Sequence, residues 1–362
     1  MSKLSEHTSR LINYKNEIDD EIIFHSKNLK EQTVQKFTEY SAVGVDAYTQ
    51  VLARGGKRIR GALTIVGYEM CGGSNKKIIL QAASAIEMTH AYILVLDDIM
   101  DKSKIRRGGP SAHVLLENYH KQNQLAGDSG HFGESIAINA ALIGSHYAQG
   151  LIASLNTDAH LKLRALSLLN DAIIVTGHGQ INDIFNEVVD EVSERAVDQV
   201  LEWKTAQYTF LNPLQFGMTL AGASKKTIES VHEYSMHAGR AFQITDDILG
   251  TFASEQEAGK SPMDDIREGK RTVLAVEALN RSDSGDKNFL IQMLGNEKLT
   301  YIEFIRCKEI FTETGALNFA QTKAIEHVSK AKESLKGCIG VFSEGGIEFL
   351  DLLVTSLLGR SK

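Results

Sequence analysis

The sequence predicts an all-α protein, and three observations support this fold class. Only three prolines occur in 362 residues, and because proline interrupts helices, their scarcity allows long ones. Apolar residues recur three or four positions apart wherever the pattern can be tested, whereas strand-like alternation is scarce. Glycine-containing breaks separate these stretches and leave helical segments of about 15 to 30 residues.

The helical spacing is clearest in three segments along the chain. The first runs from Leu11 to Ile22, the second from Ala82 to Ile93 and the third from Ile347 to Leu357. In each, the apolar side chains fall on one face of a helix. Breaks are expected between such segments, at residues 71–74, 127–133, 222–224, 250–261 and 283–285.

The domain organisation follows from the absence of a linker. Length alone favours two domains, at roughly 100 to 200 residues each. No low-complexity or Pro/Ser-rich tract divides the chain, however, so we expect a single domain over residues 1–362. Its motif-bearing core would span about 50–280, with the helices of about 281–362 packed on the same body.

Composition and charge restrict the class of protein. With 43% hydrophobic and 23% charged residues, the chain is typical of a soluble globular protein. Its net charge of −7 argues against a nucleic-acid partner. Cys71, Cys307 and Cys338 form no CxxC pair and favour a reducing compartment. The N-terminus lacks the apolar segment of a signal peptide, and no apolar run suggests a transmembrane segment, so we expect a cytoplasmic protein.

Two aspartate pairs follow apolar segments and indicate a metal site. In DDIMD, Asp97 and Asp101 are four residues apart and share one helix face, with Asp98 about 100° away. Asp246 and Asp247 follow a similar apolar stretch. Such carboxylates repel one another unless a cation neutralises them, and oxygen ligands favour Mg²⁺. A solvated acidic face would explain one such cluster, but two at matched positions favour metal binding.

Basic residues lie near both acidic clusters. Lys57, Arg58 and Arg60 occur in GGKRIR (55–60), Arg106 and Arg107 follow the first aspartates, and Lys260 and Lys270 follow the second pair. A diphosphate needs this mixture, because Mg²⁺ bridges its oxygens to carboxylates while Arg and Lys neutralise the remaining charge.

Five separated motifs resemble, in their order, those of the trans-isoprenyl diphosphate synthases, the polyprenyl synthetase family. The motifs are GGKRIR, DDIMD followed by RRGGPSAH, GQINDI (179–184), KTAQY (204–208), and AFQITDDILG followed by GKSPMDDIREGKRT. The resemblance implies an isoprenoid synthase helical bundle around a deep central cavity, usually a homodimer.

The resemblance also implies roles for individual residues. Asp97 and Asp101 would bind two Mg²⁺ ions and Asp246 a third, with Asp98, Asp247 and either Asp264 or Asp265 as supporting carboxylates. Isopentenyl diphosphate would be bound by Lys57, Arg60, His90 and Arg107. The allylic diphosphate would be bound by Arg106, Lys204, Thr205, Gln243, Lys260 and Lys270, of which Lys204, Thr205, Gln243 and Lys260 would be catalytic.

The family's reaction joins isopentenyl diphosphate head to tail to an allylic diphosphate. Its barrier is the separation of a carbocation from diphosphate, so metal ions and cationic side chains are the useful catalysts. Tyr92 and Ile93, five and four residues before Asp97, resemble a floor that ends elongation. An aromatic residue there resembles a floor that stops elongation at C15 or C20, unless Tyr92 is simply a core residue. Because the first motif has no inserted residues and only one of the two positions is aromatic, we expect the C20 product geranylgeranyl diphosphate, with C15 farnesyl diphosphate or a longer chain as the alternative.

One departure and three alternatives remain open. Gly250 stands where many relatives have a third aspartate, which leaves a third carboxylate's contribution in doubt. A di-iron site would use the ExxH pairs Glu87/His90, Glu117/His120 and Glu229/His232, but it leaves the basic motifs unexplained. A class I terpene cyclase would lack GGKRIR, and a non-catalytic subunit of a heteromeric prenyl synthase would show decayed aspartates or arginines.

Overall fold

The computed structural model describes residues 3–254 and 261–359, and it confirms the all-α prediction. Within these residues the strands are limited to one antiparallel hairpin, β1 (Ile105–Arg106) and β2 (Gly109–Pro110). The sequence pattern did not predict this hairpin. Its turn residues, Arg107 and Gly108, have φ values of 53° and 71°, and positive φ at both positions is typical of the tight turn that hairpins favour.

Residue contacts divide the chain into two compact units. The first comprises Met1–Tyr68 and Gly73–Leu166, and the second comprises Glu69–Gly72 and Ser167–Lys362. Each unit has buried apolar residues of its own. This division describes how contacts are distributed, and the single-domain expectation for residues 1–362 stays a prediction.

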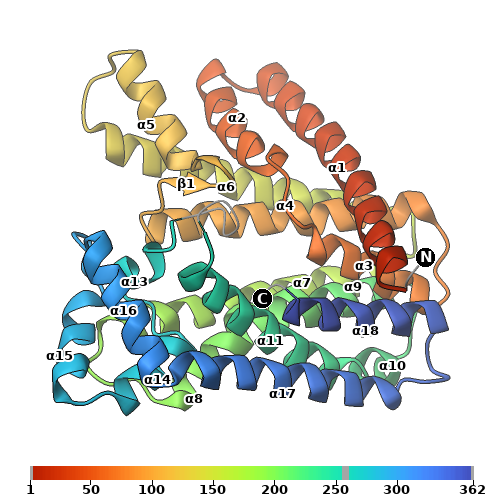
Figure 1. Ribbon diagram of the computed structural model, residues 1–362. Coiled ribbons are helices and arrows are strands. Elements are labelled where there is room, and N and C mark those ends of the chain that lie inside the picture. The colour runs from red at the N-terminus through yellow and green to blue at the C-terminus, as the bar shows by residue number, and fades with distance from the viewer. Residues whose placement is uncertain (1–2, 255–260, 360–362) are drawn as a thin grey trace. The chain divides into compact units, whose positions relative to one another are not determined.

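The first unit consists of long helices and the small hairpin (Figure 1). Its helices are α1 (Lys3–Lys36), α2 (Glu39–Ala53), α3 (Ile59–Met70, whose last two residues are assigned to the second unit), α4 (Lys76–Met100), α5 (Ala112–Gln122), α6 (Ser129–Ala153) and the start of α7 (Ala159–Val188). Tyr48 of α2 is fully buried, and its hydroxyl donates to the carbonyl of Met88 at 2.6 Å. This bond connects α2 to α4 inside the core.

The helix α4 forms much of the core of the first unit. It begins after Asn75, whose side chain accepts from the Ile78 N–H at 3.2 Å, and it ends at Met100, which Asp101 follows as the C-terminal cap. Among the residues that the structure describes, α4 alone is long and apolar enough to cross a membrane by composition, but 61% of its most apolar window is buried inside the protein. Buried Glu87 interrupts its apolar face, which is typical of a core helix.

The predicted breaks at 127–133, 250–261 and 283–285 are partly helical. The helix α6 begins inside residues 127–133, because the Asp128 side chain accepts from the N–H of His131 at 2.7 Å and caps it. Gly133 lies within the helix, where a Cβ would come 2.4 Å from the carbonyl oxygen of His113. This glycine therefore lets α5 and α6 pack closely, and it does not end a helix.

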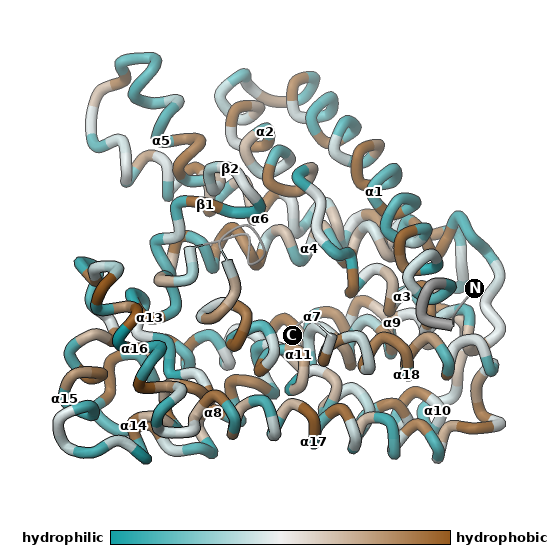
Figure 2. Tube along the Cα trace, viewed as in Figure 1, coloured by the Kyte–Doolittle hydropathy of each residue, from teal (hydrophilic) through white to brown (hydrophobic). Residues whose placement is uncertain are grey.

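The second unit contains the remaining helices. These are the rest of α7, α8 (Glu194–Val200), η1 (Leu201–Leu211), α9 (Asn212–Leu220), α10 (Lys225–Glu229), α11 (His232–Phe252), α13 (Asp264–Glu268), α14 (Val273–Arg281), α15 (Ser284–Met293), α16 (Tyr301–Glu313), α17 (Ala316–Lys336) and α18 (Glu344–Leu358). The helices α11 and α17 pack along each other, and α14 contacts both. Polar and apolar segments alternate along α17 (Figure 2), as expected for a helix buried on one side.

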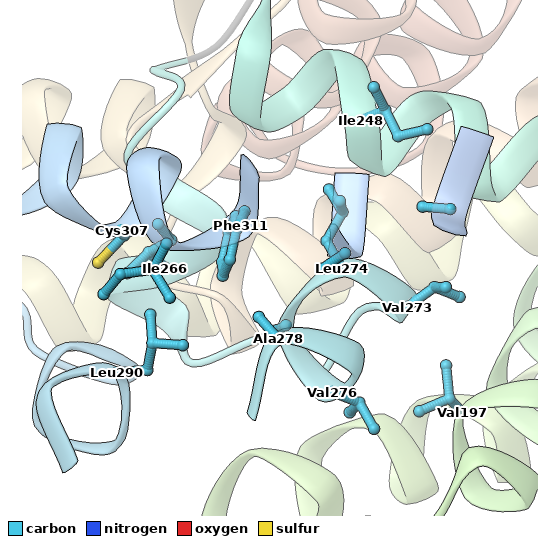
Figure 3. Close-up of a cluster of buried hydrophobic side chains, with 14 of the residues drawn as sticks. Val197, Ile248, Ile266, Val273, Leu274, Val276, Ala278, Leu290, Cys307 and Phe311 are labelled. Atoms are coloured by element: carbon cyan, nitrogen blue, oxygen red, sulfur yellow. The ribbon is translucent and has the colours of Figure 1, made fainter. Parts of the chain in front are cut away.

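A cluster of buried apolar side chains holds the second unit together. Figure 3 shows Val273, Leu274 and Ala278 of α14 among side chains from its neighbours, including Ile248 of α11 and Phe311 of α16. Small residues on α17 recur every four positions, at Ala316, Ala320 and Ala324, and they are buried. Their size permits close contact between α17 and the helices around it.

The segment that contains KTAQY is a π-helix, η1. Glycines on two neighbouring helices face it. A Cβ at Gly179 of α7 would lie 2.6 Å from the backbone nitrogen of Lys204. One at Gly239 of α11 would lie 2.3 Å from the Ala206 Cα. Because π-turns are rare and are frequently found at functional sites, this close support on two sides marks Lys204 and Thr205 as candidate site residues.

Candidate active site

Three aspartates lie at the carboxyl end of α4 in the first unit. Asp98 is buried, and its Oδ1 accepts from the Nε of Arg106 at 2.7 Å, while the Arg106 Nη2 lies 3.7 Å from the Oδ2 of Asp97. Burial raises the pKa of Asp98 to about 6, although Arg106 acts in the opposite direction. Asp97 and Asp101 are partly exposed on the adjoining face.

The position of these aspartates is unfavourable for an isolated helix. The carboxyl end of a helix carries partial negative charge, so acidic side chains there are destabilising unless cations lie nearby. Arg106 is one such cation, and the negative charge on Asp98 raises the pKa of Arg106 although burial lowers it. The site is therefore built to hold positive charge.

The hairpin and the end of α2 place Arg106. The Arg54 side chain donates from Nη1 to the carbonyl of Pro110 at 2.5 Å and to that of Arg106 at 3.3 Å. Gly109, opposite Arg106 in the hairpin, leaves room for this contact, since a Cβ there would lie 2.7 Å from the Arg54 Cζ. The Arg54 side chain thus holds the backbone of the RRGGP segment in place.

The GGKRIR loop joins α2 to α3 and brings together residues predicted to bind isopentenyl diphosphate. The Arg60 Nη1 lies 3.1 Å from the His90 Nε2, and burial together with Arg60 keeps the pKa of His90 well below its usual value. A neutral imidazole can accept this hydrogen bond. At Gly56, where φ is 140°, a Cβ would lie 2.9 Å from the Arg107 Cζ. Lys57 of the same loop is exposed.

Arginines are crowded at this loop. Burial, together with the nearby Arg58 guanidinium, lowers the pKa of Arg107 to about 10. Cationic side chains gathered in this way favour binding of an anion. This arrangement suits a diphosphate group.

Arg58 has a different role from the one suggested by its position in GGKRIR. Its side chain is 1% exposed, and it donates to the Oδ1 of Asp19 at 2.7 Å and to the carbonyl of Leu52 at 2.8 Å. Its Nη1 lies 3.5 Å from a carboxylate oxygen of Glu87, whose other oxygen accepts from the Gly61 N–H at 2.8 Å. Arg58 therefore anchors the loop and does not face a ligand.

In the second unit, η1 and α11 join three predicted residues in a chain of hydrogen bonds. The Thr205 hydroxyl donates to the Gln243 Oε1 at 2.8 Å, and the Gln243 Nε2 donates to Asp247 at 2.7 Å. Both bonds require the same orientation of the amide. Asp246, the next residue back from Asp247, is exposed.

Two predicted lysines meet carboxylates of α7. The Lys204 Nζ donates to Asp183 at 2.8 Å, and the Lys270 Nζ donates to Glu187 at 2.7 Å. The sequence pattern placed Asp183 in the GQINDI motif but gave no role to either carboxylate. Their four-residue spacing, which puts both on one helix face, was the available signal.

The remaining predicted residues are distributed as follows. Tyr92 and Ile93 are partly buried on α4. Asp264 lies 3.8 Å from Arg267 in α13, and Asp265 is buried. Lys260 lies outside the described residues.

The donor set fits Mg²⁺ better than a transition metal. In the part of the chain that the structure describes, no group of three or more His, Cys, Asp or Glu side chains forms a metal site. Mg²⁺ uses one or two carboxylates and takes its other ligands from water and phosphate, which Asp97 and Asp101 can satisfy. The di-iron alternative is not supported, because Glu87 is bonded to Gly61 and Arg58.

The fold and these residues together define a helical prenyltransferase that handles diphosphates. Comparison with protein families agrees, since the polyprenyl synthetase model matches residues 43–310. The chain therefore belongs to the polyprenyl synthetase family and is a prenyltransferase, as the order of the motifs predicted.

Individual relatives cover most of the chain. A geranylgeranyl diphosphate synthase of Saccharolobus solfataricus is 31% identical over 89% of this chain and 90% of its own length. A geranylfarnesyl diphosphate synthase of Aeropyrum pernix is 29% identical over 87% and 94%. The crystal structure of a geranylgeranyl pyrophosphate synthase from Corynebacterium glutamicum, complexed with isoprenyl diphosphate and magnesium, aligns with a TM-score of 0.90 at 27% identity, over 96% of this chain and 98% of that one.

Proposed function

We propose that the protein condenses isopentenyl diphosphate with an allylic diphosphate, head to tail (1'-4) and with Mg²⁺, to give the C20 product geranylgeranyl diphosphate. The observation that carries the proposal lies within the first unit, where the carboxylates of α4 adjoin a cluster of arginines. Such a pairing suits a metal-bound diphosphate. The similarity to geranylgeranyl diphosphate synthases supports the choice of product.

The reaction begins when the allylic carbon–oxygen bond breaks and its electron pair leaves with the diphosphate. Bound Mg²⁺, which we propose as three ions held by Asp97, Asp101 and Asp246, would neutralise charge on that leaving group. Arg106, Lys204, Lys260 and Lys270 would hold the remaining phosphate oxygens. Asp98, Asp247 and Asp264 would support them.

Thr205 and Gln243 would stabilise the allylic cation without reacting with it. The Thr205 hydroxyl donates its hydrogen bond to the Gln243 Oε1, so the hydroxyl oxygen keeps lone pairs that can face positive charge. Asp247 fixes the Gln243 amide. The alkene of isopentenyl diphosphate then attacks the cation, and the released diphosphate takes the proton lost as the trans double bond forms.

Isopentenyl diphosphate would be held by Lys57, Arg60, His90 and Arg107. Because its pKa is lowered by burial and by Arg60, His90 is neutral and does not compete with the arginines for the phosphate charge. This leaves Lys57, Arg60 and Arg107 as the cationic contacts.

Product length would be set by Tyr92 and Ile93. On α4 these residues precede Asp97 by about one turn, so a chain that grows away from the metal would meet the Tyr92 ring. The likeness to a geranylfarnesyl diphosphate synthase makes a C25 product the nearest alternative, and C15 farnesyl diphosphate is the shorter one.

We also propose that the protein is a homodimer of the cytoplasm. The support for a second copy is an apolar stripe on α7, formed by Ile174, Ile181, Phe185 and Val188, which are 51–76% exposed. Apolar side chains gathered in this way mark an interaction surface.

An elongation assay tests the proposal. Purified protein is incubated with Mg²⁺, isopentenyl diphosphate and dimethylallyl, geranyl or farnesyl diphosphate, and the products are resolved by chain length. We expect mainly C20 product, and Asp97→Ala should lower turnover by about 1,000-fold or more because a metal ligand is lost. Elongation of none of the three primers would refute the proposed function, and a main product of C30 or longer would refute the floor at Tyr92.

A further inference from the structure

The helix α7 turns polar side chains toward the interior and apolar side chains toward solvent. Gln180 and Asn186 are 9% exposed, whereas Ile181, Phe185 and Val188 are 51%, 62% and 76% exposed. A surface helix ordinarily shows the reverse pattern. Burial of polar groups costs free energy unless they are bonded, so the polar face of α7 is kept for a purpose other than packing.

Two carboxylates on this face bind the two lysines predicted to hold the allylic diphosphate. Lys204 donates to the Asp183 Oδ2 at 2.8 Å, and Lys270 donates to the Glu187 Oε1 at 2.7 Å. The Lys270 Nζ also lies 3.6 Å from the same Asp183 oxygen. The four side chains are only 12–24% exposed. The two ammonium groups therefore share one carboxylate and lie close together.

The backbone fixes this arrangement. Gly179, one turn before Asp183, allows α7 to approach η1, since a Cβ there would lie 2.6 Å from the backbone nitrogen of Lys204. Gly269 ends α13 in the left-handed conformation, with φ of 80°, and the N–H of Lys270 then donates to the Asp265 carbonyl at 2.9 Å. Gly179 and Gly269 thus fix the backbone positions from which the side chains of Lys204 and Lys270 extend.

We infer that Asp183 and Glu187 are positioning residues that hold Lys204 and Lys270 ready for the allylic diphosphate. This inference rests on the proposed function, which assigns both lysines to that group. Two ammonium groups this close would otherwise repel each other and populate several rotamers.

The carboxylates can keep their bonds while the substrate is bound. An ammonium group has three protons, so each lysine can donate to its carboxylate and to a phosphate oxygen at the same time. Donors that are already in place stabilise the charge that develops as the carbon–oxygen bond breaks. Asp183 and Glu187 would act on catalysis through the lysines and without touching the substrate.

The charge and the positioning effect of Asp183 have opposite signs, which makes the inference testable. Its negative charge weakens binding of a diphosphate, whereas its bond to Lys204 speeds the chemical step. Asp183→Asn removes the charge and loosens the lysine. This variant should therefore bind diphosphate more tightly and turn over more slowly.

The experiment measures both quantities in the full chain. Affinity for inorganic diphosphate with Mg²⁺ is measured by calorimetry, and kcat and both KM values are measured in the elongation assay. For Asp183→Asn we expect a kcat about 10- to 100-fold lower, a diphosphate Kd about 3- to 10-fold lower, and an unchanged KM for isopentenyl diphosphate. Glu187→Gln should show the same signs with smaller changes.

Two further variants make the result specific. Asp183→Glu restores the charge and should return the diphosphate Kd to the wild-type value with part of the kcat. Asp171→Asn removes an exposed carboxylate from the same helix and should change neither quantity.

Each alternative outcome is distinct. An unchanged or higher kcat in Asp183→Asn would show that the carboxylate only competes with substrate, and weaker diphosphate binding with a lower Tm would show a merely structural role. Either result overturns the inference. A wild-type protein that elongates no primer would refute the proposed function instead. The diphosphate affinities of the same variants would still test the inference: tighter binding by Asp183→Asn supports it, and weaker binding overturns it.

Discussion

At the scale of single residues, Tyr92 leads to the most specific prediction about the product. Replacing its ring by a methyl group in Tyr92→Ala should remove the obstacle that ends elongation. We expect the main product to lengthen by about one C5 unit or more, because the size of the Tyr92 side chain limits how far the growing chain can extend. The measurement is chromatographic separation of the dephosphorylated products.

A matched control is available in the same unit. Tyr40 is 82% exposed, so Tyr40→Ala loses the same atoms without opening any interior space. It should leave the product distribution unchanged. If Tyr92→Ala and Tyr40→Ala give the same products as the wild type, Tyr92 is a core aromatic and the floor lies elsewhere.

The residue types of the site could be predicted from sequence, but their contacts could not. The spacing of Asp97 and Asp101 predicts a pair of metal ligands on one helix face, and this assignment stays a prediction. Arg58 was named among the basic residues of GGKRIR but was given no site role; its burial could not be predicted from the motif, because its partner Asp19 lies far away in the chain. Asp183 was given no role because its partner, Lys204, lies elsewhere in the chain, on η1.

At the scale of elements, Arg58 connects α1, the end of α2 and α4 through buried polar contacts. It bonds Asp19 and the Leu52 carbonyl, and it pairs with Glu87, which is 2% exposed. Glu87→Gln keeps an acceptor for the Gly61 N–H but removes the charge that faces Arg58. We expect the free energy of unfolding to fall by about 3 kcal/mol, because one partner of a buried ion pair is lost.

Urea denaturation followed by circular dichroism measures this change. Because the GGKRIR loop is anchored through Arg58, the KM for isopentenyl diphosphate should also rise, while that for the allylic substrate stays constant. Glu134→Gln, at an exposed position of α6, is the control and should leave both properties unchanged. Equal stability of Glu87→Gln and the wild type would contradict the anchoring role.

Helices were predictable where apolar spacing and caps agree. Asn75 and Asp128 cap α4 and α6 through side-chain hydrogen bonds, and their residue types are those expected at such positions. The π-helix η1 was not predictable, because its apolar pattern over a short segment resembles that of an α-helix. Its support comes from Gly179 and Gly239 on other helices, and such tertiary contacts are absent from a local pattern.

At the scale of the whole molecule, the family match and the division by contacts describe different properties. The family model covers residues 43–310 and therefore runs through the boundary near residue 166. The family match measures similarity of sequence, whereas the division into units measures how densely residues contact one another. The sequence had no linker to mark that boundary, since α7 passes through it as one continuous helix.

Assembly is the remaining property of the whole molecule, and the apolar stripe of α7 predicts how to disrupt it. Phe185 and Val188 are one turn apart and are 62% and 76% exposed. In the double variant Phe185→Lys/Val188→Lys, burying two charges at a dimer interface should raise the dissociation constant at least about 30-fold. Light scattering after size exclusion should then show a dimeric wild type and a monomeric variant at the same concentration. As a control, Ile302→Lys, at an 82% exposed position of α16, should remain dimeric. A double variant that stays dimeric, or a wild type that is monomeric, would contradict a dimer formed through this stripe.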